Sequence, residues 1–297
     1  ALGFGVRGLK NLGISPVRGS FSSARELLFY SLPILLAIVS ELIVARLDVI
    51  LLGYLRDPQE AGVYRASVSV ASMVNFILGS MNIAFGPMIS ELHYLGKKLE
   101  MVSLYKRTTR WVMSVAVFVC CLILALSKEV MGFFGKEFQE GYFALSIISI
   151  GQLCNAATGS VSIVLQMTGL QKFLLINNIL SAFLNLSLNL ILIPKLGLIA
   201  SAIAAGVSLV FVNGIACMEL WAMRKIHPWD KRSLLILGLG GGLLALGGIA
   251  KLFLNSFLLV GVIMGLVYTV VVIKIALDRE DKDLIKSFFK SMASRVK

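Results

Sequence analysis

Eight long apolar stretches dominate this sequence and restrict what it can fold into. A run of about 20 apolar residues is the length that a helix needs to cross the hydrocarbon core of a bilayer. Hydrophobic residues make up 58% of the chain, against about 45–50% in soluble domains. We therefore expect an all-α polytopic membrane protein with eight transmembrane helices, near residues 27–54, 62–90, 109–127, 143–168, 174–194, 198–222, 233–254 and 257–277.

The basic residues are distributed unevenly between the predicted loops. Of 28 Lys and Arg, 21 lie in the N-terminal tail, in alternate loops and in the C-terminal tail, which together form one side of the membrane. Loops rich in Lys and Arg stay in the cytoplasm. We therefore expect a multi-pass protein of the cytoplasmic membrane with both ends of this chain cytoplasmic. This bias accounts for the net charge of +12, so no nucleic-acid partner is predicted.

Two consecutive predicted helices carry stripes of polar side chains. Intervals of three and four residues place each stripe on one helix face. A buried amide without a partner costs about 2 kcal/mol or more, so these faces must meet protein or water. They either hydrogen-bond across a packed helix interface or line a wet cavity, which the number of amides favours. The stripes are Gln152, Asn155, Gly159, Ser162 and Gln166, then Asn178, Ser181, Asn185 and Asn189.

The first predicted helix carries three ionisable residues inside its span. Glu41 lies near mid-membrane, where such a group costs about 2.5–3.5 kcal/mol and usually faces a cavity or a bundle interior. Asp48 follows seven residues later on the same face, whereas Arg46 projects elsewhere. Glu41 is a candidate cavity residue, with a structural role or protonation as alternatives. Arg46 and Asp48 either join the cavity or pair with neighbours near the outer interface.

Later spans add amides and small residues. Asn75 and Asn82 share one face of the second span, and Pro87 predicts a kink or an early end of that helix. The sixth span contains ASAIAAG, a small-residue surface suited to close helix packing. Gly261 and Gly265 have GxxxG spacing in the eighth span. We expect the last two spans to pack tightly on each other.

The residues that usually carry catalysis or bind metals form no recognisable pattern. All four cysteines fall inside predicted spans, and none has CxxC or Cys/His ligand spacing. Both histidines lie at cytoplasmic ends of spans without a nucleophile or metal partner. We therefore predict no enzyme activity, no metal site and no cofactor. These residues are Cys120, Cys121, Cys154, Cys217, His93 and His227.

The order of several short motifs resembles a known family. GQLCN at 151–155, MTG at 167–169 and LNLILIPKLG at 188–197 follow one another as they do in the carboxyl half of the polysaccharide transporters. This family of lipid-linked oligosaccharide flippases is similar to the O-antigen flippases. It belongs to the superfamily that includes the MATE drug exporters and the lipid II flippase. The resemblance extends over about residues 25–295.

The resemblance implies an architecture. Complete members have two six-helix lobes around a central cavity, often with two extra helices at the carboxyl end. The chain, which has no initiator Met, would then be the later part of a longer protein. Its predicted parts are a cytoplasmic amphipathic linker at 1–24, a six-helix lobe at 25–224, two additional helices at 225–277 and a cytoplasmic amphipathic tail at 278–297.

The resemblance also implies a function, which is to flip a polyprenyl-diphosphate-linked oligosaccharide for surface polysaccharide synthesis by alternating access. Expected partners are the lipid-linked glycan, membrane lipids and the other lobe, from the same polypeptide or from a second copy. Arg46 is the candidate for the diphosphate. Two alternatives remain: a MATE-like cation-coupled exporter of small molecules, and a non-catalytic scaffold of glycan assembly. The candidate cavity residues are Glu41, Arg46, Asp48, Asn75, Asn82, Gln152, Asn155, Ser162, Gln166, Asn178, Ser181, Asn185 and Asn189.

Overall fold

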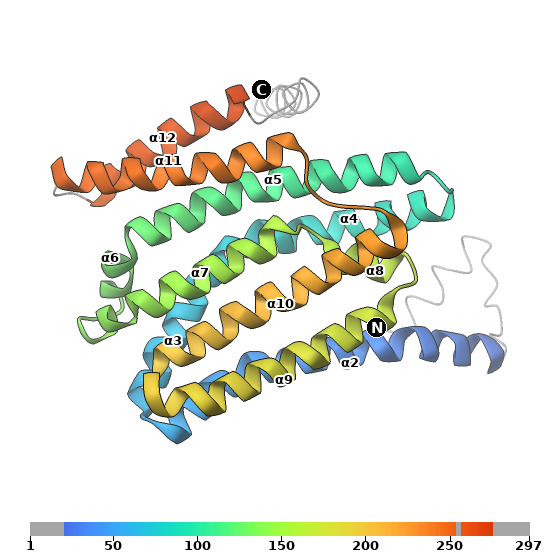
Figure 1. The fold of residues 1–297 in the computed structure, drawn as a ribbon, viewed down its shortest axis with the longest axis horizontal. Helices are drawn as coiled ribbons and strands as arrows, with labels where there is room; N and C mark the ends of the chain where they lie inside the picture. Colours follow the sequence, from blue (N-terminus) through green and yellow to red (C-terminus); the bar gives the residue numbers. More distant parts are fainter. Residues whose placement is uncertain (1–20, 254–256, 276–297) are drawn as a thin grey trace, which may run out of the picture.

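The protein is a bundle of long helices that run roughly side by side (Figure 1). This computed structural model describes residues 21–253 and 257–275, and this part of the chain contains no strand. The predicted tail at 278–297 and all but the last residues of the predicted linker at 1–24 lie outside it. The elements are α2 (Phe21–Leu55), α3 (Pro58–Ala71), the 3₁₀ helix η1 (Ser72–Asn75), α4 (Phe76–Tyr94), α5 (Lys98–Ala125), α6 (Ser127–Gly132), η2 (Glu137–Gly141), α7 (Tyr142–Ala157), α8 (Val161–Met167), α9 (Gln171–Leu196), α10 (Leu198–Arg224), α11 (Lys231–Phe253) and α12 (Phe257–Ile275).

Several of these helices are long and apolar enough to cross a membrane. Among the described residues five pass this test, and a sixth joins them if the bent pair α7 and α8 counts as one span. The prediction of an all-α protein with several membrane spans is therefore confirmed. The two remaining predicted spans fall on α2 and α12, which are not in this count. The number eight stays a prediction.

The helices pack in a sequence that runs across the bundle (Figure 1). Helix α2 packs on α9, α9 packs on α10, and α10 packs on α7. Helix α7 also contacts α3 and α5, and α5 contacts α11 and α12. The α7–α10 contact is close because two glycines meet there. A Cβ atom added to Gly151 would lie 2.8 Å from the Cα atom of Gly206. The small residues predicted to allow close packing in the sixth span do so here.

The single helix predicted over 143–168 is broken. Helix α7 ends at Ala157, and α8 continues at an angle of 41°. Gly159 lies in the break with a φ of +60°, and a Cβ there would collide with Thr109. The carbonyl of Thr158, freed by the break, accepts a hydrogen bond of 2.7 Å from Tyr105 Oη. Gly159 adopts a backbone conformation that favours glycine and so interrupts the predicted span.

The second predicted span is also interrupted, but not where proline predicted it. The 3₁₀ helix Ser72–Asn75 separates α3 from α4 in the middle of the run. Helix α4 continues through Pro87 to Tyr94, so the early end predicted at this proline is wrong. A transmembrane helix tolerates proline where neighbouring groups satisfy the freed backbone.

Helices α11 and α12 pack on each other and also on α5. A Cβ atom added to Gly247 of α11 would lie 2.8 Å from the Sδ atom of Met264 in α12. The GxxxG pair of α12 faces α5 instead, since a Cβ at Gly265 would lie 3.4 Å from the ring of Phe118. The expectation that the last two spans pack on each other is confirmed, but the GxxxG pair serves a different contact.

A polar cluster anchors the loop that joins α10 to α11. Arg110 Nη1 of α5 donates a hydrogen bond of 3.0 Å to Asp230 Oδ2. The backbone N–H of Ser233 donates to Asp230 Oδ1 at 2.7 Å. Burial opposes ionisation of Asp230, but the bonds from Ser233 and the charge of Arg110 prevail and lower the pKa of this carboxyl. The loop is thereby tied to α5 at one end of the bundle.

Candidate functional site

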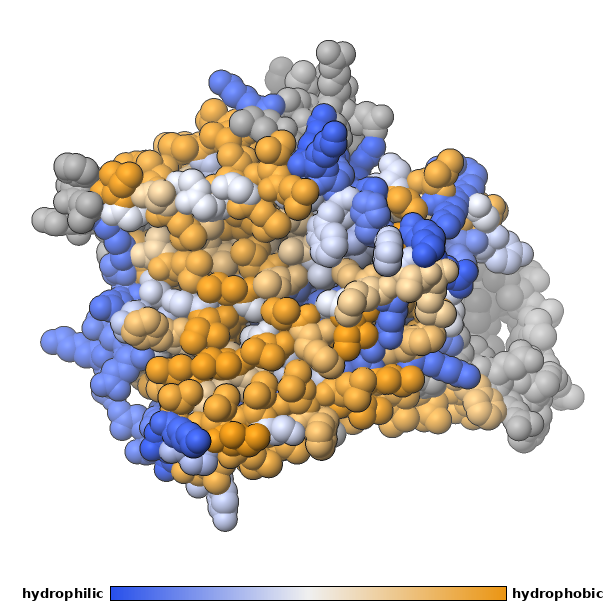
Figure 2. Space-filling model, in the orientation of Figure 1, coloured by the Kyte–Doolittle hydropathy of each residue, from blue (hydrophilic) through white to orange (hydrophobic). Residues whose placement is uncertain are grey.

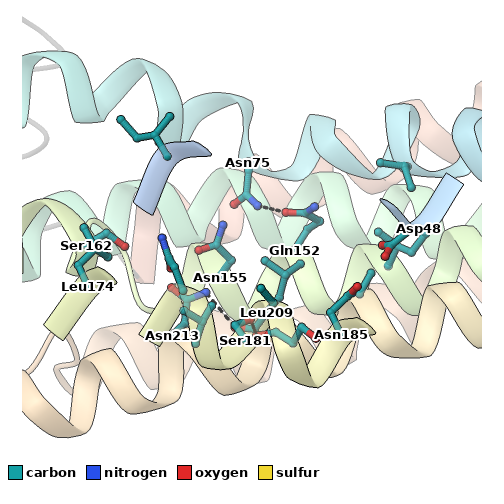
Figure 3. A pocket seen from close by; sticks show the side chains of 18 of the residues that line it. Asp48, Asn75, Gln152, Asn155, Ser162, Leu174, Ser181, Asn185, Leu209 and Asn213 are labelled. Atoms are coloured by element: carbon teal, nitrogen blue, oxygen red, sulfur yellow. Dashed lines mark hydrogen bonds between the residues drawn. The ribbon is translucent and has the colours of Figure 1, made fainter. Parts of the chain in front are cut away.

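A cavity of about 640 Å³ lies between α2, α3, η1, α7, α8, α9 and α10 (Figure 3). This volume is within the range of ligand sites, about 300–1,000 Å³. Polar side chains come from 13 of its 23 lining residues, more than a packed interface of membrane helices requires. They are Asp48, Tyr64, Arg65, Asn75, Gln152, Asn155, Ser162, Gln166, Asn178, Ser181, Asn185, Ser208 and Asn213.

The wall from α7 and α8 carries the first polar stripe. Gln152, Asn155, Ser162 and Gln166 all line the cavity although the helix is broken between them. Across from them, Asn75 Nδ2 donates a hydrogen bond to Gln152 Oε1, which Figure 3 shows as a dashed line. The 3₁₀ helix that ends at Asn75 thus brings its amide to this wall. The fifth member of the stripe, the glycine in the break, is buried and does not line the cavity.

The wall from α9 carries the second stripe. Asn178, Ser181 and Asn185 line the cavity, and Figure 3 shows Ser181 and Asn185 along this wall. Ser181 Oγ donates to the carbonyl oxygen of Ser208 in α10 at 3.1 Å. The α9 stripe therefore lines the cavity and also hydrogen-bonds to the neighbouring helix. A wet cavity and a packed helix interface are thus compatible interpretations of this stripe.

At one end of the cavity a buried carboxylate joins four helices. Asp48 of α2 is 5% exposed. Its Oδ2 accepts from Tyr64 Oη of α3 at 3.0 Å, and its Oδ1 accepts from Asn189 Nδ2 of α9 at 2.9 Å. Tyr64 Oη also lies 3.4 Å from the carbonyl oxygen of Ser201 in α10. Asn189 Nδ2 contacts Asn185 Oδ1 at 3.0 Å, which links this cluster to the α9 stripe.

Three predicted site residues whose side chains the structure describes are not among those that line the cavity. Arg46 is exposed on α2 and is not one of the lining residues. Asn82 accepts a hydrogen bond from Ser160 Oγ and so supports the α7–α8 break. Asn189 reaches the cavity only through its bond to the buried carboxylate. The side chain of Glu41 lies outside the described residues.

Tyr64, Arg65, Ser208 and Asn213 line the cavity but were not predicted to do so. Arg65 was grouped with the basic residues of the non-cytoplasmic side, although it falls three residues inside the span predicted from residue 62. Asp57 caps this helix by accepting from the backbone N–H of Gln59 at 2.9 Å, and proline follows at the first helical position. This Asp-Pro pair is a helix start signal. It would have placed Arg65 about two turns inside the helix.

The chemistry of the cavity is that of a hydrogen-bonding site. Amides and hydroxyls both donate and accept, as sugar hydroxyls do. Arg65 is the one basic residue among the lining residues that the structure describes, and Asp48 is the one acidic residue. Within the described part of the chain, no group of three or more His, Cys, Asp and Glu side chains could hold a metal ion.

Comparisons with known proteins identify related sequences. The MatE family model matches residues 33–191. The probable low-salt glycan biosynthesis flippase Agl15 of Haloferax volcanii is 24% identical to the chain over 202 residues. These residues are 68% of this chain and 43% of Agl15, so the chain spans less than half the length of that relative. No solved structure matches the chain.

Proposed function

This chain belongs to the MatE family, and from that premise we propose that it is one lobe of a flippase for a polyprenyl-diphosphate-linked oligosaccharide. The observation that supports this proposal most directly is the cavity with its 13 polar lining side chains. A polar glycan crosses hydrocarbon only if the protein replaces the hydrogen bonds that its hydroxyls make with water. Neutral amides on both walls provide such bonds without the cost of burying many charges.

The diphosphate of such a cargo requires positive charge, and Arg65 takes the role first given to Arg46. Arginine binds phosphate oxygens through a planar fork of N–H donors. Arg65 lines the cavity together with Tyr64 and Asp48, whereas Arg46 is exposed outside it. We assign the glycan to the amide walls of the cavity and the diphosphate to Arg65.

The other half of the cavity comes from a second lobe in this proposal. The chain covers 43% of the glycan flippase that it resembles, which suits one lobe of two. The seven elements that line the cavity form one side of a site, and rocking of the lobes would open it to each face of the membrane in turn. The protein resides in the cytoplasmic membrane with both ends of this chain in the cytoplasm, as the distribution of basic residues favours.

Complementation tests the proposal. The complete reading frame that contains this chain is expressed in cells lacking their own glycan flippase, and surface polymer is measured. We expect polymer to be restored, and a double substitution of Asn155 and Asn178 by Leu to abolish it at equal membrane abundance. Gln59→Ala is the matched control, since it removes an exposed amide outside the cavity and leaves transport intact.

Other outcomes distinguish the alternatives. Export of cationic dyes without transfer of any glycan would favour a MATE-like exporter of small molecules. Polymer that is restored equally by the wild type and by the double variant would contradict the assignment of the cavity as the transport path. A membrane-inserted protein that restores no polymer with several glycans, but restores polymer synthesis when a second flippase is supplied, would favour a scaffold.

A further inference from the structure

A second cavity opens on the outer surface of the bundle, apart from the polar site. It has a volume of about 620 Å³ and lies between α7, α10 and the loop that joins α10 to α11. Its walls are largely apolar, with Cys217, Met218, Trp221 and Trp229 among the lining residues. Met218 and Trp221 are 62% and 57% exposed. Apolar groups of this size on a membrane helix face lipid rather than water. We call this cavity the outer groove, where outer refers to the surface of the bundle and not to a side of the membrane.

Basic side chains gather at one end of the outer groove. Lys106 Nζ lies 3.5 Å from the Nε2 atom of His227, which lines the groove. Lys225 Nζ lies 4.9 Å from the centroid of the Trp221 ring. Figure 2 shows hydrophilic residues at this end of the molecule, beside the apolar surface of the helices. We call Lys106, Lys225 and His227 the basic cluster.

No acid of the same loop neutralises the basic cluster. Asp230, the acidic residue of the α10–α11 loop, accepts a hydrogen bond from Arg110 and is occupied by that contact. A basic cluster beside an apolar, tryptophan-lined groove has the composition of the membrane interface, where aromatic rings lie at the level of the lipid headgroups. A soluble phosphate would use the charges but not the apolar walls. A zwitterionic lipid would fill the walls and present a phosphate, but its ammonium group would add a positive charge beside the basic cluster.

We propose that the outer groove binds an anionic phospholipid, with an acyl chain along the two tryptophans and the phosphate at the basic cluster. Its volume is within the range of ligand sites, about 300–1,000 Å³. This site is separate from the proposed transport of glycans and does not depend on it. The two sites approach each other at Asn213 of α10, which lines both cavities.

Fluorescence quenching by brominated lipids tests this proposal. The chain has three tryptophans, and Trp111→Phe leaves the two that line the groove as the reporters. This variant is reconstituted in vesicles with brominated phosphatidylglycerol or brominated phosphatidylcholine at equal mole fraction. We expect stronger quenching by the anionic lipid. Each lysine of the cluster should contribute about fivefold to the preference, as a basic residue does at an anionic membrane surface.

Charge variants separate the groove from general attraction of the protein to anionic membranes. Lys106→Gln with Lys225→Gln should bring the ratio of anionic to zwitterionic quenching close to one, with quenching by the zwitterionic lipid unchanged. Lys98→Gln with Lys172→Gln removes the same charge from two exposed lysines elsewhere and should leave the ratio as it was. Equal quenching by both lipids before these changes, or an equal loss in both double variants, would overturn the proposal.

Discussion

The contact of α7 with α10 makes a prediction that can be worked out from the structure. Gly151→Ala would place a methyl group 2.8 Å from the Cα atom of Gly206. Carbon atoms in contact prefer separations of about 3.5–4.0 Å, so the two backbones would have to move apart by roughly 1 Å. The atoms nearest to the added methyl group are all backbone atoms of Gly206, which cannot rotate out of the way as a side chain can. The helices themselves must shift.

Two opposing terms set the size of the effect. Overpacking of this kind costs about 1–3 kcal/mol, and the better helix propensity of alanine offsets up to about 1 kcal/mol of it. We expect Gly151→Ala to lower the free energy of unfolding by about 1–2 kcal/mol. Gly79 in α4 is the matched control, because no atom lies within 4 Å of a Cβ added there. Gly79→Ala should leave stability unchanged or raise it.

The measurement is unfolding of the purified protein in mixed micelles, followed by helical circular dichroism as the denaturing detergent fraction rises. The transport assay then reports on geometry. Gln152 follows Gly151 directly and lines the cavity, so a shift of α7 displaces the amide wall and should reduce transport at equal abundance. Equal stability for Gly151→Ala and Gly79→Ala would refute the argument that backbone contact fixes this helix pair.

Three further predictions follow from the polar contacts. Tyr64→Phe leaves an acceptor of buried Asp48 unpaired, which costs about 1–3 kcal/mol; an unchanged free energy of unfolding in the same titration would contradict this. Arg65→Gln should reduce glycan transport about tenfold or more, since hydrogen bonds to charged groups contribute about 1.5–3 kcal/mol. Arg46→Gln changes a residue outside the cavity lining and should transport normally; equal losses in the two variants would reject the assignment of the diphosphate to Arg65. The pKa of Asp230 in the folded state is lowered from its usual 3.8. The stability that ionised Asp230 contributes is therefore present above pH 3.8 and is lost as the pH falls through the folded-state pKa; unfolding of Asp230→Asn, measured over this acidic range, should lack this pH dependence.

The helical class was predictable from the sequence because apolar runs and period-3.6 patterns are local properties. The break between α7 and α8 was not predicted, because the helical spacing of Asn155, Gly159 and Ser162 continues through it. Its signal is Gly159, which adopts a positive φ and is in close contact with Thr109. The absence of a side chain at Gly159 leaves room for Thr109, which is more than 40 residues away in the sequence. A contact between such distant residues cannot be predicted from the local pattern. The 3₁₀ turn at Ser72–Asn75 has no proline or glycine to mark it.

Nine of the thirteen candidate residues line the cavity, and helical spacing selected most of them. Polar side chains at three- and four-residue intervals lie on one face, which the α9 residues Asn178, Ser181 and Asn185 illustrate. Arg46 was chosen as the basic residue of the cavity because it alone lay deep in a predicted span. Arg65 fell only three residues inside the span predicted from residue 62, whereas the helix begins at Pro58. Asn213 of α10 lines the cavity although it belongs to neither of the predicted polar stripes. Which helix faces which is a tertiary property that periodicity does not specify.

Helix α5 separates two parts of the bundle that can change independently. It contacts α7 on one side and carries α11 and α12 on the other. None of the described residues that line the polar cavity comes from α5, α11 or α12. Insertions, deletions or sequence drift in the last two helices therefore leave the cavity wall in place, provided that α5 keeps its packing. Changes in the terminal pair act on the packing against α5 and not on the described side chains that line the polar cavity.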